Sequence, residues 1–270
     1  FRAALLAESA DNLIRWIYRE ILGLNHANAA FTKDYQERKN LLNALDNPEN
    51  EVTDFCLFVN CKGKEAIYFL TNNTPYEREK FLECLSQYEY SPEELAKIVS
   101  AVYPEMASYL APYHFGIPLF DDYFQRYKLQ KLTNRTAPDF EELVNPQPMV
   151  RAYNQLVPSR CSVTEKLGGK EFCAYYIDAL GAEFLGFMLD RCRYYGLMAN
   201  VTICRANIPT ITSKNKEFVE EFQTSGTTIV TIKELDEIKH QGKENFDYEK
   251  TKLPLHLIRE LEIIDDVLKK

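Results

Sequence analysis

Apolar side chains recur three or four positions apart, the spacing of a helix, through most of the first 150 residues. The clearest stretch has charged residues between its apolar positions, which are Leu5, Leu6, Leu13, Ile14, Ile17, Ile21 and Leu22. The segment Ser91-Pro92-Glu93-Glu94 is typical of a helix start, because it supplies a capping hydroxyl, a proline at the first helical position and acids in the first turn. The pattern predicts a mostly helical domain over residues 1–150.

Two stretches interrupt this pattern. The apolar runs 54–59 and 66–70 flank Lys62-Gly63-Lys64, and they suit either a β-hairpin or two helix fragments, because periodicity does not separate the two over so few residues. Between residues 134 and 169 the pattern breaks at several prolines and at a Gly-Gly pair. We place the boundary between two domains in this second stretch, near residue 150.

Beyond that boundary, strand-like and helix-like segments alternate. The predicted strands are 172–177, 200–204 and 227–232, and the predicted helices are 182–195, 214–222 and 253–270. Such alternation implies parallel strands joined by right-handed crossovers. The predicted fold class is therefore α/β, with a mostly helical N-terminal domain over 1–150 and an α/β domain with a mainly parallel sheet over 151–270.

Composition and charge narrow the classes of function. Hydrophobic residues make up 46% of the chain, which suits a globular protein, and the net charge of −8 disfavours broad electrostatic capture of nucleic acid. Seven cysteines, none of them in a CxxC pair, indicate a reducing cytoplasmic setting. No apolar run reaches 18 residues, so we expect no membrane partner.

Asp178 is the first candidate for chemistry. It follows the apolar run 172–177 directly, and open α/β sheets place their ligands at the carboxyl ends of their strands. A carboxylate held there can coordinate a divalent metal ion. The alternative is that Asp178 caps the helix predicted to follow it.

The second candidate is the hydroxyl-rich segment Pro209-Thr210-Ile211-Thr212-Ser213-Lys214-Asn215, which follows the next predicted strand. One of its hydroxyls could attack phosphorus, and Asn215 could donate a hydrogen bond to a phosphoryl oxygen. The alternative is that a threonine or serine caps a helix after a turn fixed by proline.

Together these residues resemble the start of a PglZ domain, a branch of the alkaline phosphatase superfamily. Members of that superfamily open with an apolar strand that ends in a metal-binding Asp, and Tyr175-Tyr176-Ile177-Asp178-Ala179-Leu180-Gly181 is similar, with Ala179 where Gly is commoner. Its nucleotide pyrophosphatase/phosphodiesterase branch carries a Pro-Thr-x-Thr-x-x-Asn pattern, and residues 209–215 match every fixed position of it. The two motifs lie 34 residues apart, and the match covers roughly residues 170–270.

The resemblance implies a metal-dependent phosphatase or phosphodiesterase acting in bacteriophage exclusion (BREX). It implies Asp178 and Thr212 as metal ligands, Thr212 as nucleophile with Thr210 or Ser213 as alternatives, and Asn215 as a donor to the phosphoryl group. Two divalent ions, Zn²⁺ or Mn²⁺, are implied for a complete domain. The implied partners are a phosphoester substrate, for which nucleic acid is one candidate, and other defence-system proteins.

One departure from the superfamily pattern is plain. The superfamily completes its metal sites with later Asp and His ligands, commonly in an Asp-His-Gly-like motif, and the sequence has no such motif before Lys270. Since the chain begins at Phe1 without Met and a helical pattern reaches its last residue, we expect the N-terminal part of an enzyme, inactive by itself. The alternative is a non-catalytic scaffold subunit of a defence complex.

Overall fold

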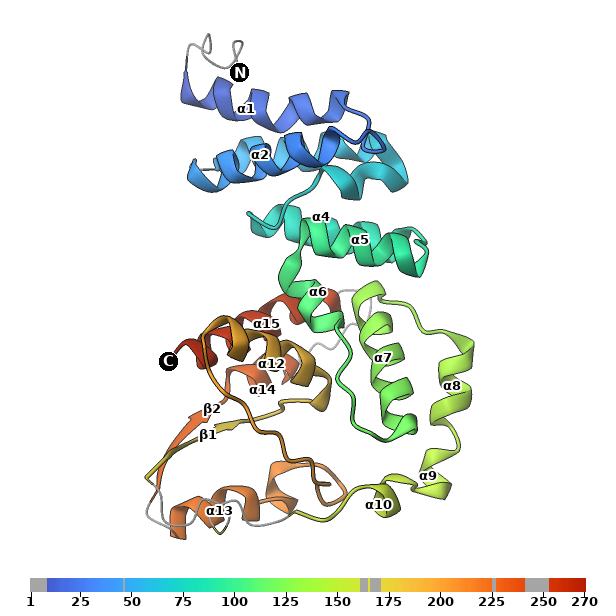
Figure 1. Ribbon diagram of the computed structural model, residues 1–270, viewed down its shortest axis with the longest axis vertical. Coiled ribbons are helices and arrows are strands. Elements are labelled where there is room, and N and C mark those ends of the chain that lie inside the picture. Colours follow the sequence, from blue (N-terminus) through green and yellow to red (C-terminus); the bar gives the residue numbers. More distant parts are fainter. Residues whose placement is uncertain (1–8, 46, 161–164, 166–170, 225–226, 241–252) are drawn as a thin grey trace. The chain divides into compact units, whose positions relative to one another are not determined.

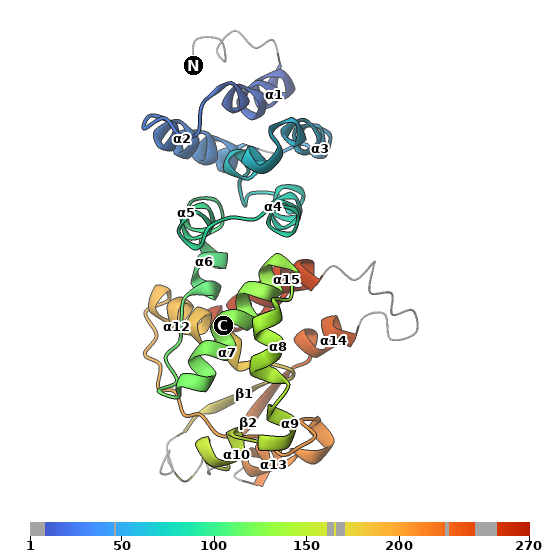
Figure 2. The ribbon, with the colours of Figure 1, turned by 90° about the vertical axis from the view of Figure 1, so that its right-hand side faces the viewer.

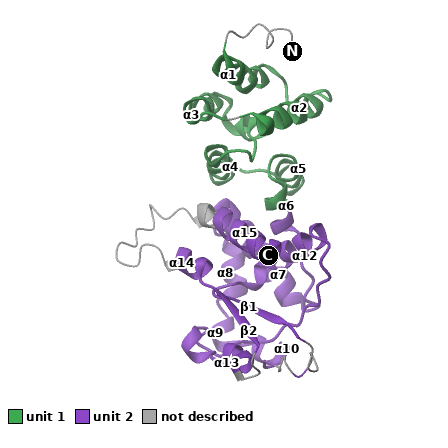
Figure 3. Cartoon of the chain, turned by 90° about the vertical axis from the view of Figure 1, so that its left-hand side faces the viewer, with its two compact units in different colours: residues 1–107 green, residues 108–270 purple. Residues whose placement is uncertain are grey.

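The computed structural model describes residues 9–45, 47–160, 165, 171–224, 227–240 and 253–270 (Figures 1 and 2). The chain forms two compact units, Phe1–Ala107 and Ser108–Lys270 (Figure 3). The sequence placed the boundary near residue 150, whereas the helices between 108 and 150 make their contacts within the second unit. Proline and glycine between 134 and 169 therefore punctuate one unit rather than separate two.

The described secondary-structure elements of unit 1 are all helices. Its elements are α1 (Ala10–Glu20), η2 (Ile21–Gly23), α2 (Phe31–Ala44), α3 (Glu49–Phe58), η3 (Val59–Phe69), α4 (Pro75–Gln87) and α5 (Pro92–Val102). The stretch 54–70 is a pair of helix fragments rather than a hairpin, and Gly63 breaks η3 with a φ of 55°. A side chain would strain this left-handed conformation, which accounts for the glycine.

Hydroxyl caps fix where three of these helices begin. The Ser9 and Thr74 side chains accept the backbone N–H groups of Asn12 and Glu77 at the starts of α1 and α4. α5 begins as its sequence predicted, with a reciprocal capping box between Ser91 and Glu94. Local side-chain chemistry therefore marks where these helices begin.

A buried carboxylate organises the centre of unit 1. Glu77 is 0% exposed, and it accepts hydrogen bonds from the Thr71 N–H (3.0 Å) and from the hydroxyls of Thr71 (3.0 Å), Thr74 (3.1 Å) and Tyr18 (3.3 Å). Arg38 supplies a buried positive charge close enough to act on Glu77, and it also donates to two main-chain carbonyls. The carboxylate thus links α1 and α4 with the turn before α4.

Unit 2 holds the strands. Its helical elements are α7 (Pro118–Thr133), α8 (Pro138–Val144), α9 (Gln147–Val150), α10 (Tyr153–Leu156), η4 (Ala182–Phe184), α12 (Leu185–Tyr194), η5 (Thr212–Lys214), α13 (Glu217–Thr224), α14 (Glu234–His240) and α15 (Leu253–Lys269), and α6 (Pro104–Leu110) spans the division between the units. The strands are β1 (Cys173–Ile177) and β2 (Thr228–Ile232).

The two strands pair in parallel, with Cys173 opposite Thr228 and Ile177 opposite Ile232, so the predicted parallel pairing is confirmed. The strand predicted at 200–204 is wrong. Residues 200–204 join no ladder with the described part of the chain, which forms one isolated parallel bridge beside them, between Ser159 and Arg205. The described part of the chain is therefore mostly helical with a two-stranded sheet, which agrees with the α/β class.

Helices α12, α14 and α15 lie on one side of the strands and α13 lies on the other (Figures 1 and 2). Ile232 at the end of β2 packs with Leu235 and Ile238 of α14 and with Ile263 of α15. This apolar cluster fixes α14 directly after β2. The polar first turn of α14 is thereby held next to the carboxyl end of β1.

Buried charges hold α7 within unit 2. Lys128 is 2% exposed and donates to the carbonyls of Ala111 (2.6 Å) and Leu110 (3.3 Å), and burial lowers its pKa to about 8. Glu260 of α15, 1% exposed, pairs with Lys131 of α7 and with Lys239 of α14 (3.4 Å). A carboxylate inside the apolar stripe of α15 therefore has two partners that offset its burial.

Candidate functional site

Asp178 extends the sheet by one hydrogen bond and then leaves it. Its N–H donates to the carbonyl of Ile232 (3.0 Å), and its Oδ1 accepts the N–H of Ala179 (3.0 Å). Ala179 has a φ of 62°, which turns the chain sharply away from β1. The following helical turns begin after Gly181 and Phe184 without a side-chain cap, so the alternative of Asp178 as a helix cap is wrong.

A lysine supports this turn from α14. Lys239 Nζ donates to the carbonyl of Ala179 (2.8 Å) while it also pairs with the buried Glu260 (3.4 Å). A left-handed alanine is costly by itself, and a second anchor on its carbonyl helps to hold it. The orientation of the Asp178 carboxylate is therefore determined by β2 and α14 as well as by its own strand.

Thr212 meets Asp178 across 34 residues of chain. Its Oγ1 donates a hydrogen bond to Asp178 Oδ1 at 3.2 Å. Thr212 opens the short turn η5, and no side chain caps that turn. The structure thus brings together the two residues that the sequence singled out in separate motifs.

Asn215 lies beside this pair, but its side chain holds the loop. It is 6% exposed, its Oδ1 accepts the N–H of Asn207 (2.7 Å), and its Nδ2 donates to the carbonyls of Ile211 (3.0 Å), Asn207 (3.3 Å) and Pro209 (3.4 Å). These bonds use the amide on both sides. A role as phosphoryl donor would require some of them to break.

These residues border a pocket of about 670 Å³. Its lining residues are Tyr176, Ile177, Asp178, Ala179, Leu180, Ala206, Thr210, Ile211, Thr212, Asn215, Phe218 and Asp236. Thr210, the first alternative nucleophile, is on this wall, whereas Ser213 is not one of the lining residues. The geometry therefore favours Thr212, because Thr212 is hydrogen-bonded to the carboxylate.

Asp236 borders the same pocket, although the sequence paired it only with His240, four residues away on one helix face, and did not place it beside Asp178. It lies in the first turn of α14, four residues after β2 ends, so it reaches the same pocket from the strand next to β1. Burial raises the pKa of Tyr176, and the Asp178 and Asp236 carboxylates raise it further, while a hydrogen bond with Thr212 opposes them. The sequence carried a signal for Asp236, because an aspartate follows each of the two paired strands within four residues.

The donor set fits part of a divalent metal site. Asp178 and Asp236 offer carboxylate oxygens and Thr212 offers a hydroxyl, ligands that suit Mn²⁺ and that Zn²⁺ also accepts. Within the described residues no group of three or more His, Cys, Asp and Glu side chains is placed to share an ion. The residues in view would therefore supply only part of the coordination of one ion.

Comparison with known protein families finds a match for one part of the chain. Residues 2–88, which lie in unit 1, match a family model described as a domain of unknown function (DUF7863). The chain matches no curated protein and no solved structure. In the part of the chain that the structure describes, no helix combines the length and the apolar character needed to cross a membrane.

Proposed function

We propose that the pocket at Asp178 belongs to a metal-dependent phosphatase or phosphodiesterase of the PglZ type that acts in bacteriophage defence. The observation that carries this proposal is the 3.2 Å hydrogen bond from Thr212 to Asp178. It joins a candidate nucleophile to a candidate metal ligand in the order that the superfamily uses. The likeness to the PglZ domain rests on the sequence motifs, and the geometry adds support at these two residues.

The protein's own residues have distinct tasks in this proposal. Asp178 accepts the hydrogen of the Thr212 hydroxyl and so orients its oxygen, and Asp236 adds a second negative charge on the pocket wall. Asn215 keeps the segment that carries Thr212 in place. A divalent ion bound by Asp178, Thr212 and Asp236 would polarise a phosphoryl group and make the Thr212 hydroxyl easier to deprotonate.

Hydrolysis of bis(4-nitrophenyl) phosphate by the complete natural protein, in the presence of Mn²⁺ or Zn²⁺, tests the proposal, since the described residues supply only part of the coordination of one ion. Turnover should require the metal, and Thr212→Ala and Asp178→Asn should each lower it by at least about a hundredfold, since each removes a group acting on the reacting phosphorus. Thr210→Ala is the matched control, because it deletes the same hydroxyl from the same pocket wall and should retain turnover.

Turnover retained in both Thr212→Ala and Asp178→Asn would contradict the assignment. Loss of turnover in Thr210→Ala with retention in Thr212→Ala would transfer the nucleophile to Thr210. If the complete wild-type protein turns over no diester with either metal, a catalytic role for these residues is contradicted and the second candidate is favoured.

That second candidate is a non-catalytic scaffold of a defence complex, and an aromatic cluster favours it. The rings of Tyr113, Phe115 and Phe124 follow one another at 4.8 Å spacing, and Tyr123 stacks on Phe140 at 5.5 Å. All five are only half-buried, and aromatic anchors of this kind are common at interfaces.

Cells carrying the complete defence system separate the two candidates. The double variant Asp178→Asn/Thr212→Ala should lose protection against phage if the pocket is catalytic. Full protection by the double variant, at unchanged protein level, would leave the scaffold as the function.

A further inference from the structure

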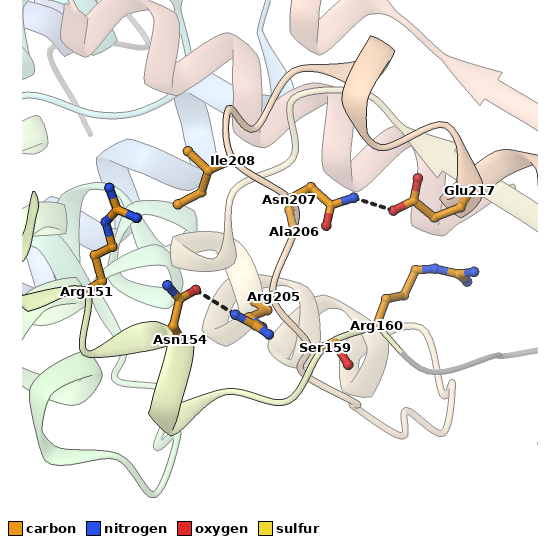
Figure 4. Close-up of a pocket in the computed structure, with 9 residues that line it drawn as sticks. All are labelled: Arg151, Asn154, Ser159, Arg160, Arg205, Ala206, Asn207, Ile208 and Glu217. Atoms are coloured by element: carbon orange, nitrogen blue, oxygen red, sulfur yellow. Dashed lines mark hydrogen bonds between the residues drawn. The ribbon is translucent and has the colours of Figure 1, made fainter.

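A second pocket lies in unit 2, with a volume of about 450 Å³ (Figure 4). Its lining residues are Arg151, Asn154, Ser159, Arg160, Arg205, Ala206, Asn207, Ile208 and Glu217. Three arginines from different segments therefore border one pocket in a chain whose net charge is −8. Its chemistry is the opposite of the pocket at Asp178, which two aspartates border.

Two of the three arginines have no carboxylate partner among the described residues. Arg205 donates from Nη1 to the side-chain oxygen of Asn154 (2.6 Å), and Arg151 donates from Nε to the carbonyl of Pro148 (3.3 Å). Arg160 is paired with Glu221, and Glu217 accepts a hydrogen bond from Asn207 (2.7 Å). Positive charge on Arg151 and Arg205 thus faces the pocket with only neutral partners.

The backbone fixes these arginines in place. Arg151 follows α9 with a φ of 50°, and its N–H donates to the carbonyl of Gln147 (2.8 Å). The N–H of Arg205 donates to the carbonyl of Pro158 (2.9 Å), beside the bridge to Ser159. Figure 4 shows Arg151 and Arg205 arising from two separate segments that meet at Asn154. The main-chain positions from which these two side chains extend are therefore fixed.

We propose that this second pocket binds the phosphate group of a small phosphorylated molecule. Guanidinium groups match phosphate oxygens with paired hydrogen bonds, and Asn154 and Ser159 add neutral polar groups at the rim. A nucleic-acid strand fits less well, because it needs a long positive track and the acidic chain supplies three arginines in one place. The inference does not require hydrolysis at Thr212.

Isothermal titration with sodium pyrophosphate, in buffer containing EDTA, tests the inference without any contribution from a metal site. The wild-type protein should bind one pyrophosphate per chain. Arg151→Gln/Arg205→Gln should bind at least about tenfold more weakly, because each change removes a charge-assisted contact. Arg193→Gln is the matched control, since it removes the same charge from an exposed position on α12 and should bind as the wild type does.

Arg151→Gln alone guards against a folding artefact. Arg151 is exposed, and its side-chain bond within the described structure goes to a main-chain carbonyl, so its replacement should leave the melting temperature unchanged while still weakening pyrophosphate binding. Equal binding by the wild type and by both arginine variants would overturn the proposal, as would no saturable binding to the wild type.

Two further measurements separate this pocket from the other one and from nucleic acid. Thr212→Ala should bind pyrophosphate as the wild type does, and loss of binding in that variant would move the ligand to the other pocket and overturn the proposal. A short single-stranded oligonucleotide should not compete with pyrophosphate. If the oligonucleotide bound more tightly than pyrophosphate and displaced it, the ligand of this pocket would be a nucleic acid. That result would overturn the proposal of a small phosphorylated molecule.

Discussion

Replacing Glu77 by glutamine should destabilise unit 1 more than any surface change in the same unit. Glutamine has nearly the same shape. With its carbonyl oxygen at the Oε1 position it can still accept the Thr71 N–H, and its amide can donate to two of the three hydroxyls that donate to Oε2 in the wild type. The shape term is therefore small. What remains is the loss of the negative charge opposite the buried Arg38.

The charge term sets the magnitude. Leaving a buried hydrogen-bonding group without its partner costs about 1–3 kcal/mol, and groups next to a charge lie at the upper end of this range. Glu77→Gln leaves one buried hydroxyl without its acceptor and removes the charge that acts on Arg38, so we expect a cost of about 3 kcal/mol. With a urea m-value of about 1–2 kcal/mol/M for a unit of this size, the midpoint of unfolding should fall by about 1.5–3 M.

The chain carries its own reporter for this measurement. Its single tryptophan, Trp16, lies half-buried in α1, so its fluorescence during a urea titration reports the unfolding of unit 1. Glu37→Gln is the matched control, because Glu37 is exposed and forms only a 4.0 Å surface pair with Lys33, worth less than about 0.5 kcal/mol. A Glu77→Gln protein within about 1 kcal/mol of the wild type would refute the view that this carboxylate organises unit 1.

Three further changes test unit 2. Ala179→Gly should stabilise unit 2 by up to about 1 kcal/mol in thermal unfolding, because glycine adopts the left-handed conformation without strain. Part of this gain is lost because glycine also raises the conformational entropy of the unfolded chain. A lower melting temperature would contradict this prediction. The lowered pKa of Lys128 means that the folded state binds fewer protons than the unfolded state between about pH 8 and 10.5, so over this window the wild type should gain up to about 3 kcal/mol relative to Lys128→Met; a difference in unfolding free energy that stays constant with pH would refute it. Asn215→Ala should expose the segment 207–215 to limited proteolysis, since it removes four hydrogen bonds, whereas the exposed Thr210→Ala should not.

The helices of unit 1 and both paired strands were predictable because their signals are local. The Ser91 capping box and the apolar runs before Asp178 and after Thr227 each specify their own conformation. The run 200–204 carries the same kind of signal, yet a strand also needs a neighbour, and among the described residues that neighbour is limited to the bridge between Ser159 and Arg205. A sequence pattern shows which face of a strand is apolar, but it does not show whether a neighbouring strand is available to pair with its edge.

The residues of the candidate site, too, were predictable only in part. Asp178 and Thr212 were identified from two sequence motifs, and a hydrogen bond joins the two side chains in the structure. Asn215 was expected to face a phosphoryl group, but the carbonyls of its own loop compete for its amide, and that competition depends on the path of the loop. The sequence related Asp236 only to His240 and not to this site, because the parallel pairing of β2 with β1 is what carries Asp236 to the pocket.

The segment from Arg205 to Asn215 links the two proposed sites. Arg205 borders the arginine pocket, Thr212 borders the acidic pocket, and Ala206 lies on the walls of both. The four hydrogen bonds of Asn215 fix this segment as a single piece. Thr212→Ala should therefore affect hydrolysis and leave pyrophosphate binding intact, Arg151→Gln should affect pyrophosphate binding first, and Asn215→Ala should impair both. If Asn215→Ala impaired only one of them, the two pockets would not share a rigid wall, and each proposal would have to be judged separately.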